Sequence, residues 1–225
     1  MHKVYILVSG FSGKMGTAIR KLGSESHNLR FHDIEKVDSK SKAEFDLIID
    51  FSLPSFSSHA LSKAIELELP ILIGTTGHDK EFILSIESAS KKIPVLYEAN
   101  FSKGIRLLKR TLHEFVNRNH TEVKLIRIFE SHHLNKKDIP SGTALSLRDF
   151  LTSMFSSVDQ TIEIYAQRAN NIFGIHRIEI VLKNEEVISF LHNAESRDIF
   201  AHGAIEAGLW LVKQKPGIHQ LENIN

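Results

Sequence analysis

The first hundred residues alternate between continuous apolar runs and segments in which apolar side chains recur every three or four positions. The continuous runs occupy residues 3–10, 45–52, 69–77 and 93–102, with a shorter run at 28–33. Such runs are typical of strands that are buried on both faces of a sheet. The segments between them have the spacing of amphipathic helices and cover residues 11–24, 55–68 and 79–92. Strands that alternate with helices predict an α/β fold with a parallel sheet.

The pattern changes after residue 102. Helical spacing continues in residues 103–119 and 141–155, whereas strands are predicted at 122–130, 161–167 and 175–194. The last run is divided at Asn184-Glu185-Glu186, and strands at hairpin spacing predict a mixed or antiparallel sheet. A final apolar helix begins near Arg197 and ends before Pro216-Gly217.

Two domains are the simplest interpretation of this change, and a chain of 225 residues has room for two of modest size. We predict a dinucleotide-binding domain of residues 1–102, against which the C-terminal segment of about 199–225 returns to pack. The second domain, residues 103–198, is predicted to be an α+β domain built on a mixed sheet.

The composition excludes several classes of protein. The chain has no cysteine, which excludes disulfides, thiolate nucleophiles and cysteine-based zinc sites. The net charge of +1 offers no basic surface, so we expect no nucleic-acid partner. No apolar run approaches the roughly 20 residues that span a bilayer, and the apolar start is too short for a signal peptide. We therefore expect a cytoplasmic protein that does not associate with membranes.

Three glycines, spaced G-x-x-G-x-x-G, lie between the first predicted strand and the first predicted helix. Such a turn lets the backbone approach a pyrophosphate at the helix N-terminus, as in a Rossmann-like dinucleotide fold. We therefore expect an N-terminal Rossmann-like parallel sheet that binds NADH or NADPH. The alternative is a glycine-rich turn without a ligand. The cofactor-binding candidates here are Gly10, Ser12, Gly13, Lys14, Met15 and Gly16.

Asp33 ends the second predicted strand, twenty positions after Gly13. A Rossmann-like fold places an acid about 20 residues after the glycines to bind the ribose hydroxyls, which favours NADH. A solvent-facing loop aspartate is the alternative, and Lys36 nearby would still tolerate a 2′-phosphate. Ligands of open α/β sheets bind beyond the carboxyl ends of the strands. The loops after two further strands therefore supply candidates for the nicotinamide side: Gly74, Thr75, Thr76, Ala99, Asn100 and Phe101.

The segment ESHHLNKKDIPSGTA, residues 130–144, places cations just before a helix start. Pro140 and Ser141 suit the beginning of a helix, where unpaired N–H groups and the helix dipole attract anions. We expect backbone N–H groups here to bind a carboxylate, with countercharge from the neighbouring cations. A solvated turn with surface histidines is the alternative. The candidates are His133, Lys136, Ser141, Gly142 and Thr143.

The adjacent pair His132 and His133 raises the question of a metal. Neighbouring residues on a strand point to opposite faces of the sheet, and we identify no partner histidine or carboxylate motif nearby. We therefore predict no metal site.

Six motifs are distributed along nearly the whole length of the chain: GFSGKMG, IIDFSLP, GTTG, ANFS, ESHHLNKKDIPSGTA and ESRDIFAHGAIEAGLWL. In this combination the chain resembles the 4-hydroxy-tetrahydrodipicolinate reductase family, also called the dihydrodipicolinate reductase family. The resemblance implies reduction of a small cyclic dicarboxylate with NADH or NADPH, in diaminopimelate and lysine biosynthesis. It also implies a homotetramer assembled through the sheet of the second domain.

The resemblance also implies roles for individual residues. By motif position, His132 matches the catalytic acid of the family, and Lys136 matches its proton donor and substrate cation. Substrate contacts are matched by His133, Gly142 and Thr143, and the nicotinamide side by loops 74–76 and 98–101. The loop that contains Arg168, Gly174 and His176 keeps these residues. The chain departs from the family pattern at Lys103, Asn170 and Asn171.

The chemistry of such a reaction agrees with these residue types. Hydride addition to a C=C–C=N system leaves negative charge on carbon or nitrogen, and that atom must be protonated. His132 can deliver a proton near neutral pH, as can a lysine in a perturbing site. Two other functions stay open: another two-domain dehydrogenase that acts on an amino acid such as aspartate, and a non-catalytic NAD-binding sensor.

Overall fold

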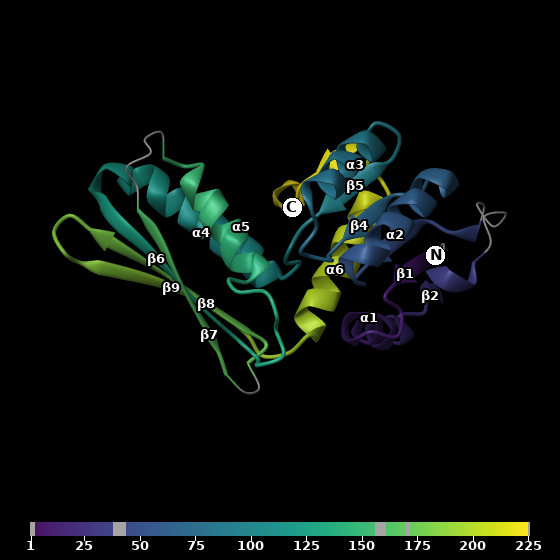
Figure 1. Ribbon diagram of the computed structural model, residues 1–225, viewed down its shortest axis with the longest axis horizontal. Coiled ribbons are helices and arrows are strands. Elements are labelled where there is room, and N and C mark those ends of the chain that lie inside the picture. Colours follow the sequence, from purple (N-terminus) through teal and green to yellow (C-terminus); the bar gives the residue numbers. More distant parts are fainter. Residues whose placement is uncertain (1–2, 38–43, 156–160, 170–171, 225) are drawn as a thin grey trace. The chain divides into compact units, whose positions relative to one another are not determined.

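The computed structural model describes residues 3–37, 44–155, 161–169 and 172–224, which form two compact units (Figure 1). The first unit combines the N-terminal part, up to Ser102, with the C-terminal part from Arg197. The second unit runs from Lys103 to Ser196. The departures at Asn170 and Asn171 lie outside the described residues. None of the helices in the described part is long and apolar enough to cross a membrane.

A six-stranded parallel sheet forms the centre of the first unit. Its strands are β1 (Val4–Ser9), β2 (Leu29–Asp33), β3 (Leu47–Asp50), β4 (Ile71–Ile73), β5 (Pro94–Tyr97) and β10 (Gly217–His219). Their order is β10-β5-β4-β3-β1-β2, and each neighbouring pair is parallel. All four residues of β3 are buried, as its continuous apolar sequence predicts.

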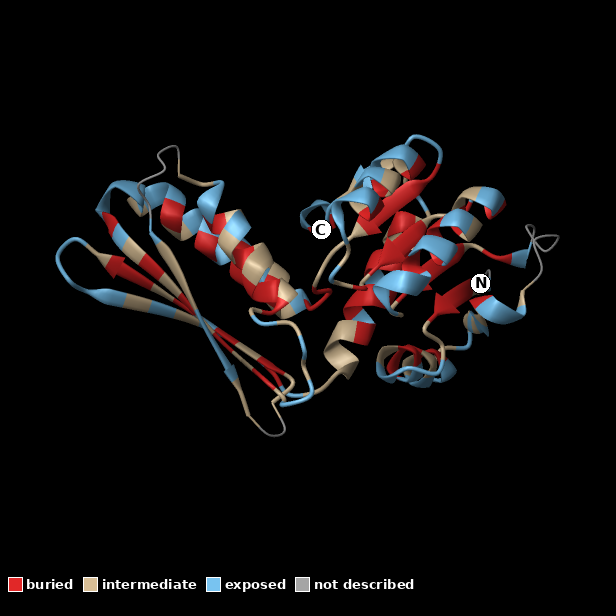
Figure 2. Ribbon diagram, in the orientation of Figure 1, coloured by how far each residue is buried: buried red, intermediate tan, exposed pale blue. Residues whose placement is uncertain are grey.

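Helices cover both faces of this sheet, which is why its central strands, such as β3 and β4, are buried (Figure 2). On one face, α1 (Lys14–Ser24) and α6 (Asp198–Leu211) share a core with side chains of β1, β3, β4 and β5. On the other face, α2 (Pro54–Leu67) and α3 (Lys80–Ser90) form a second core with the alternate side chains of these strands. Short 3-10 helices η1 (Ile34–Lys36) and η4 (Leu221–Asn223) follow β2 and β10.

The first unit differs from the sequence prediction in strand length and number. β4 and β5 have three and four residues, far fewer than the predicted runs, so Gly74 and Ala99 already lie in loops. The last strand, β10, was not predicted. It follows the break at Pro216 and pairs with β5, with Ile218 opposite Val95.

The second unit is built on a mixed sheet. It contains β6 (Val123–His132), β7 (Ile162–Arg168), β8 (Gly174–Leu182) and β9 (Val187–Ala194) in the order β7-β6-β8-β9. β6 is parallel to β7 and antiparallel to β8, which is antiparallel to β9. The predicted fold class, a Rossmann-like parallel sheet with a second α+β unit on a mixed sheet, is confirmed.

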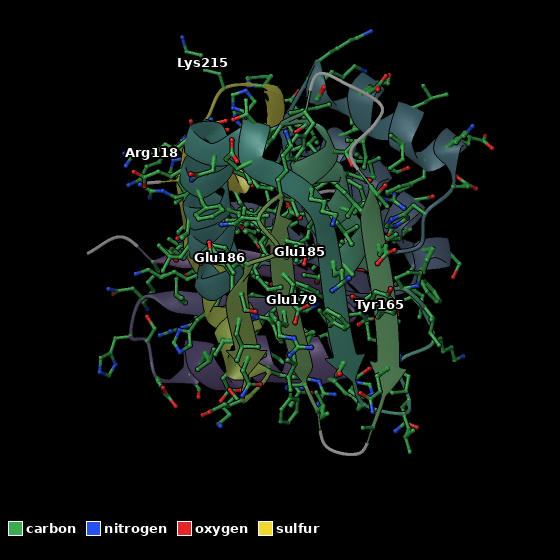
Figure 3. All side chains as sticks on the ribbon, turned by 90° about the vertical axis from the view of Figure 1, so that its left-hand side faces the viewer. Arg118, Tyr165, Glu179, Glu185, Glu186 and Lys215 are labelled. Carbon is green, nitrogen blue, oxygen red and sulfur yellow. The ribbon has the colours of Figure 1, made fainter. Side chains whose placement is uncertain are left out.

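One face of the mixed sheet packs against helices. These are α4 (Lys103–Asn119) and α5 (Gly142–Thr152), and they share an apolar core with Ile126, Ile128, Ile178 and Ile180. A short 3-10 helix, η3 (His120–Glu122), joins α4 to β6. Figure 3 looks onto the other face of the sheet, where the side chains of Tyr165 and Glu179 are labelled.

Candidate functional site

The glycine turn between β1 and α1 has the geometry that a pyrophosphate requires. Gly10 has a φ of +79°, and its carbonyl oxygen accepts a hydrogen bond from the N–H of Gly13 at 2.9 Å. A Cβ on Gly16 would lie 2.3 Å from that same oxygen, so only glycine allows α1 to begin so close to the turn. Gly13 is the N-cap of α1 and no side chain caps the helix, as expected for a terminus that binds an anion. The residues at this turn therefore fit a dinucleotide.

The other candidates in this turn have different surroundings. Ser12 and Lys14 are exposed, whereas Met15 is half-buried and packs against the core below α1. Asp33 ends β2 opposite Val8 of β1, at the carboxyl edge of the sheet. Its side chain accepts a hydrogen bond from the N–H of Glu35 at 3.2 Å, which caps η1 and holds the carboxylate near the strand end.

The loops after β3 and β4 are tied together by a buried carboxylate. Asp50 accepts hydrogen bonds from the hydroxyls of Ser52 (2.5 Å), Ser57 (2.6 Å) and Thr75 (2.9 Å). The ring of Phe51 lies where a Cβ on Gly74 would be, at 2.1 Å, so this loop also requires a glycine. Two of the cofactor-binding candidates, Gly74 and Thr75, therefore stabilise the conformation of the loop.

The loop after β5 is mostly buried. Asn100 accepts a hydrogen bond from the N–H of Ser102 at 2.8 Å, and Phe101 is 3% exposed in the first core. Thr76 and Ala99 are half-buried. Direct cofactor contact is therefore easiest for the half-buried members of these two loops.

A buried carboxylate organises the second unit where β6 ends. Glu130 and His132, two residues apart on β6, point to the same face, and a very short hydrogen bond joins the Glu130 carboxylate to Nδ1 of His132. The other carboxylate oxygen accepts hydrogen bonds from Nη1 of Arg168 at 2.9 Å and the N–H of Ser141 at 3.2 Å. The Glu130 side chain is fully buried. Burial alone would raise its pKa, but the bonds from His132 and Arg168 lower the pKa to about 2.

Two further histidines lie in the same row across the sheet. His176 of β8 is directly opposite Glu130, and His192 of β9 is directly opposite His176. The His176 ring is edge-on to that of His132, with 5.1 Å between centroids. His176 is 1% exposed, and neither ring nitrogen has a hydrogen-bond partner within the described part of the chain. Burial, and then the charges of His132 and His192, lower its pKa to about 3, so the ring is neutral.

The turn that leads into α5 contains the predicted anion site. Nζ of Lys136 lies 2.9 Å from Oδ1 of Asp138, whose Oδ2 accepts a hydrogen bond from the N–H of Gly142 at 3.2 Å. Burial would raise the pKa of Asp138, but the bond and charge of Lys136 hold it below the usual range. The chain's own carboxylate therefore bridges the lysine and the helix start. Arg168 fixes the turn, because it donates to the carbonyl of Asp138 at 2.5 Å and to that of Lys136 at 3.4 Å.

The remaining substrate candidates lie at the two ends of this turn. Ser141 is the N-cap of α5 and its hydroxyl accepts a hydrogen bond from the N–H of Ala144 at 3.2 Å. Thr143 is buried in the first turn of the helix. His133 follows the end of β6, half-buried, and its carbonyl accepts from the N–H of Lys136 at 3.0 Å.

The sequence argument that no carboxylate or histidine stands near His132 is wrong. Glu130, His132 and His176 each offer a ligand atom, and these atoms lie within 4.8 Å of one another. Glu130 shares a face with His132 through its i, i+2 spacing, which was readable from the sequence. His176 comes from another strand, and only the register reveals it. The Arg168 guanidinium, 2.9 Å from Glu130, makes the cluster unfavourable for a metal cation.

Comparisons with known proteins agree with these two units. Residues 4–101 match the family model for "Dihydrodipicolinate reductase, N-terminus", and residues 104–224 match that for "Dihydrodipicolinate reductase, C-terminus". A 4-hydroxy-tetrahydrodipicolinate reductase of Bdellovibrio bacteriovorus is 38% identical over 100% of this chain and 97% of the relative. The protein of the same name from Caldanaerobacter subterraneus is 32% identical and covers 98% of each chain.

Solved structures share the fold at low sequence identity. A dipicolinate-bound dihydrodipicolinate reductase from Paenisporosarcina sp. TG-14 gives a TM-score of 0.71 at 18% identity over 100% of both chains. An aspartate dehydrogenase from Thermotoga maritima gives 0.53 at 14% identity, over 96% of this chain and 98% of that one. The glycine turn and the two-sheet fold define a two-unit oxidoreductase with a dinucleotide-binding sheet. Within that class, the chain belongs to the dihydrodipicolinate reductase family, and the resemblance inferred from the sequence is confirmed.

Proposed function

We propose that this chain reduces 4-hydroxy-tetrahydrodipicolinate to tetrahydrodipicolinate in diaminopimelate and lysine biosynthesis, with NADH or NADPH as reductant and with loss of the 4-hydroxyl group as water. The observation that carries this proposal is the cluster at the end of β6. There a buried His132 is held by Glu130, and Arg168 links that carboxylate to the turn with Lys136. A proton donor next to an anion-binding helix start suits a reaction in which the substrate is held by its carboxylate and protonated at another atom.

The cofactor is assigned to the carboxyl edge of the parallel sheet. The turn of residues 10–16 would hold the pyrophosphate, and loops 74–76 and 99–101 would flank the nicotinamide. Asp33 would accept hydrogen bonds from the ribose hydroxyls and repel a 2′-phosphate, which favours NADH. The bound nicotinamide supplies the hydride.

The substrate is assigned to the turn before α5. Lys136 and His133 would supply positive charge to a carboxylate, and Ser141, Gly142 and Thr143 would supply the helix start. Because Asp138 already bridges Lys136 and the Gly142 N–H, the substrate carboxylate must exchange with it. His132 would deliver the one proton that the atom left negative by hydride addition requires. Lys136 would supply positive charge to the substrate and is the alternative donor of that proton.

The second unit is also assigned a role in assembly. On the sheet face seen in Figure 3, Tyr165 stacks on Phe129 with 5.0 Å between ring centroids, and Leu191 is 65% exposed. Exposed apolar side chains on a flat sheet are suited to pairing with another subunit. We propose a cytoplasmic homotetramer that uses this face. A monomeric mass by light scattering at micromolar concentration would contradict the assembly.

The test of the activity is NADH and NADPH oxidation with freshly prepared 4-hydroxy-tetrahydrodipicolinate. His132→Gln keeps a hydrogen-bonding side chain but cannot donate a proton at neutral pH, so kcat is expected to fall by about 10²-fold or more. Lys136→Ala is expected to raise KM as well as lower kcat, because a charge-assisted contact contributes about 1.5–3 kcal/mol. NADH affinity, measured by fluorescence, should survive in both variants. No oxidation of either nucleotide by the wild-type protein would refute the activity, and turnover of aspartate with NAD⁺ would replace it.

A further inference from the structure

The Glu130 carboxylate accepts hydrogen bonds from three different parts of the second unit. His132 belongs to its own strand, Arg168 to β7 and Ser141 to the start of α5. An ionised carboxylate accepts hydrogen bonds and has no hydrogen to donate, and the lowered pKa of Glu130, about 2, keeps it ionised at any pH of catalytic interest. Each group that faces the Glu130 carboxylate must therefore supply the hydrogen of the bond between them.

This has a direct consequence for the His132 ring. Nδ1 must carry a hydrogen, because it faces an acceptor that has none to give. The proton that comes and goes is then the one on Nε2. No described residue hydrogen-bonds Nε2, and strand β8 begins beside it with Gly174, where an added Cβ would lie only 3.2 Å away. A side chain at position 174 would crowd the nitrogen that has to exchange its proton.

We propose that Glu130 is a positioning residue for the proton donor: it holds Nδ1–H of His132, so that the proton delivered to the substrate leaves from Nε2. This role rests on the proposed function. In the proton-transfer step, the Nε2–H bond breaks and a bond forms from that proton to the substrate atom left negative by hydride addition. The ring ends neutral with its hydrogen on Nδ1, still bonded to Glu130, and solvent restores the Nε2 proton.

The same carboxylate aligns the donor with the proposed substrate site. It binds the N–H of Ser141, the residue that caps α5, and Arg168 connects it to the carbonyls of Lys136 and Asp138. The position of the His132 ring is thus coupled through one side chain to both ends of the turn that would bind the substrate carboxylate. A purely structural ion pair would not require this coupling to the ring.

The decisive variant is Glu130→Gln, which keeps the shape but offers one oxygen to three donors. If the amide NH₂ faces His132, Nδ1 has to accept, and the neutral ring then carries its hydrogen on Nε2. That ring is a poor acid at Nε2, so kcat is expected to fall by about 10²- to 10⁴-fold, with a smaller change in KM. The matched control is Glu114→Gln, which removes an exposed glutamate 2.7 Å from Arg118 on α4. It should leave kcat unchanged.

A second measurement does not depend on activity, and its wild-type part does not require the Glu130 variant to fold. ¹⁵N NMR of the imidazole nitrogens, over pH 6–9, distinguishes the Nδ1–H from the Nε2–H tautomer, and His132→Gln identifies the signals of His132 by difference. In the wild-type protein we expect Nδ1 to carry a hydrogen at every pH measured. In Glu130→Gln we expect the neutral ring to switch to the Nε2–H form.

These measurements distinguish a failure of the proposed role of Glu130 from a failure of the proposed reductase activity. A wild-type His132 with a bare Nδ1 would overturn the proposal, as would a Glu130→Gln protein whose kcat matches that of the Glu114→Gln control. A wild-type protein that oxidises neither nucleotide would refute the proposed function. The tautomer spectrum would then still decide whether Glu130 holds Nδ1–H.

Discussion

Replacing the buried histidine of β8 should make the second unit less sensitive to acid. His176→Leu removes a ring whose nitrogens have no hydrogen-bond partner among the described residues and whose pKa is lowered to about 3. In the unfolded chain the same ring takes up a proton near its ordinary pKa of about 6.5. Between these values only the unfolded state binds the proton, so stability is complete above pH 6.5 and is lost as the pH falls towards 3.

The size of the effect follows from the two pKa values. One pKa unit is a tenfold difference in proton affinity and is worth about 1.4 kcal/mol. The full span from 6.5 to about 3 therefore corresponds to about 5 kcal/mol of unfolding free energy. Between pH 7 and pH 5 the loss from His176 alone is about 2 kcal/mol. For a unit of the size of Lys103–Ser196 that corresponds to a difference of about 8–16 °C in Tm. The leucine variant should lack this component, and at pH 7 it should be at least as stable as the wild type, because no polar ring nitrogen is left buried and unpaired.

The assay is scanning calorimetry of the wild type and the variant at pH 7 and pH 5. Trp210, the one tryptophan of the chain, lies in α6, so its fluorescence identifies the transition of the first unit. His120→Leu, at an exposed position in the second unit, is the control and should retain the wild-type pH dependence. If His176→Leu loses as much stability between pH 7 and pH 5 as the wild type does, the ring is protonated or hydrated in the folded state and the reasoning fails.

Three further substitutions test the other parts of the site. Asp33→Ala should narrow the difference between NADH and NADPH affinities, measured by fluorescence titration, and unchanged values for both would remove Asp33 from the cofactor site. Gly174→Ala places a Cβ 3.2 Å from Nε2 of His132 and should lower kcat by up to about 10²-fold through displacement of the ring; an unaffected kcat would argue against Nε2 as the donor atom. Thr75→Val removes a buried hydroxyl that donates to Asp50 at 2.9 Å, and should destabilise the first unit by about 1–3 kcal/mol in urea unfolding followed by tryptophan fluorescence. Wild-type stability would show that the hydroxyl is replaceable.

The sequence predicted the elements that carry a strong periodic signal. Fully buried strands such as Leu47–Asp50 and helices such as Lys103–Asn119 have patterns long or continuous enough to be recognised. β10 was missed because three residues, Gly217–His219, are too few to establish a period. Its place in the sheet comes from pairing with β5, a contact more than a hundred residues away in the chain.

The candidate site divides in the same way. His132 and Lys136 stand in a contiguous motif, so the sequence alone is enough to make them candidates. The environment of His132 depends on strand register: His176 reaches it because Glu130 and His176 are paired across β6 and β8. A shift of one residue would have turned that histidine to the opposite face, and a single sequence does not fix the register of distant strands.

The discontinuous first unit has a consequence for synthesis on the ribosome. Its parallel sheet needs α6 to cover the core face that includes Leu47, Ile49 and Leu72, and α6 and β10 lie in the last 29 residues, from Arg197 onward. The second unit, Lys103–Ser196, is continuous and emerges complete before those residues do. We therefore expect the second unit to finish folding before the first. Until α6 is synthesised, one apolar face of the N-terminal strands stays exposed to solvent. That interval is when the nascent chain would most need a chaperone.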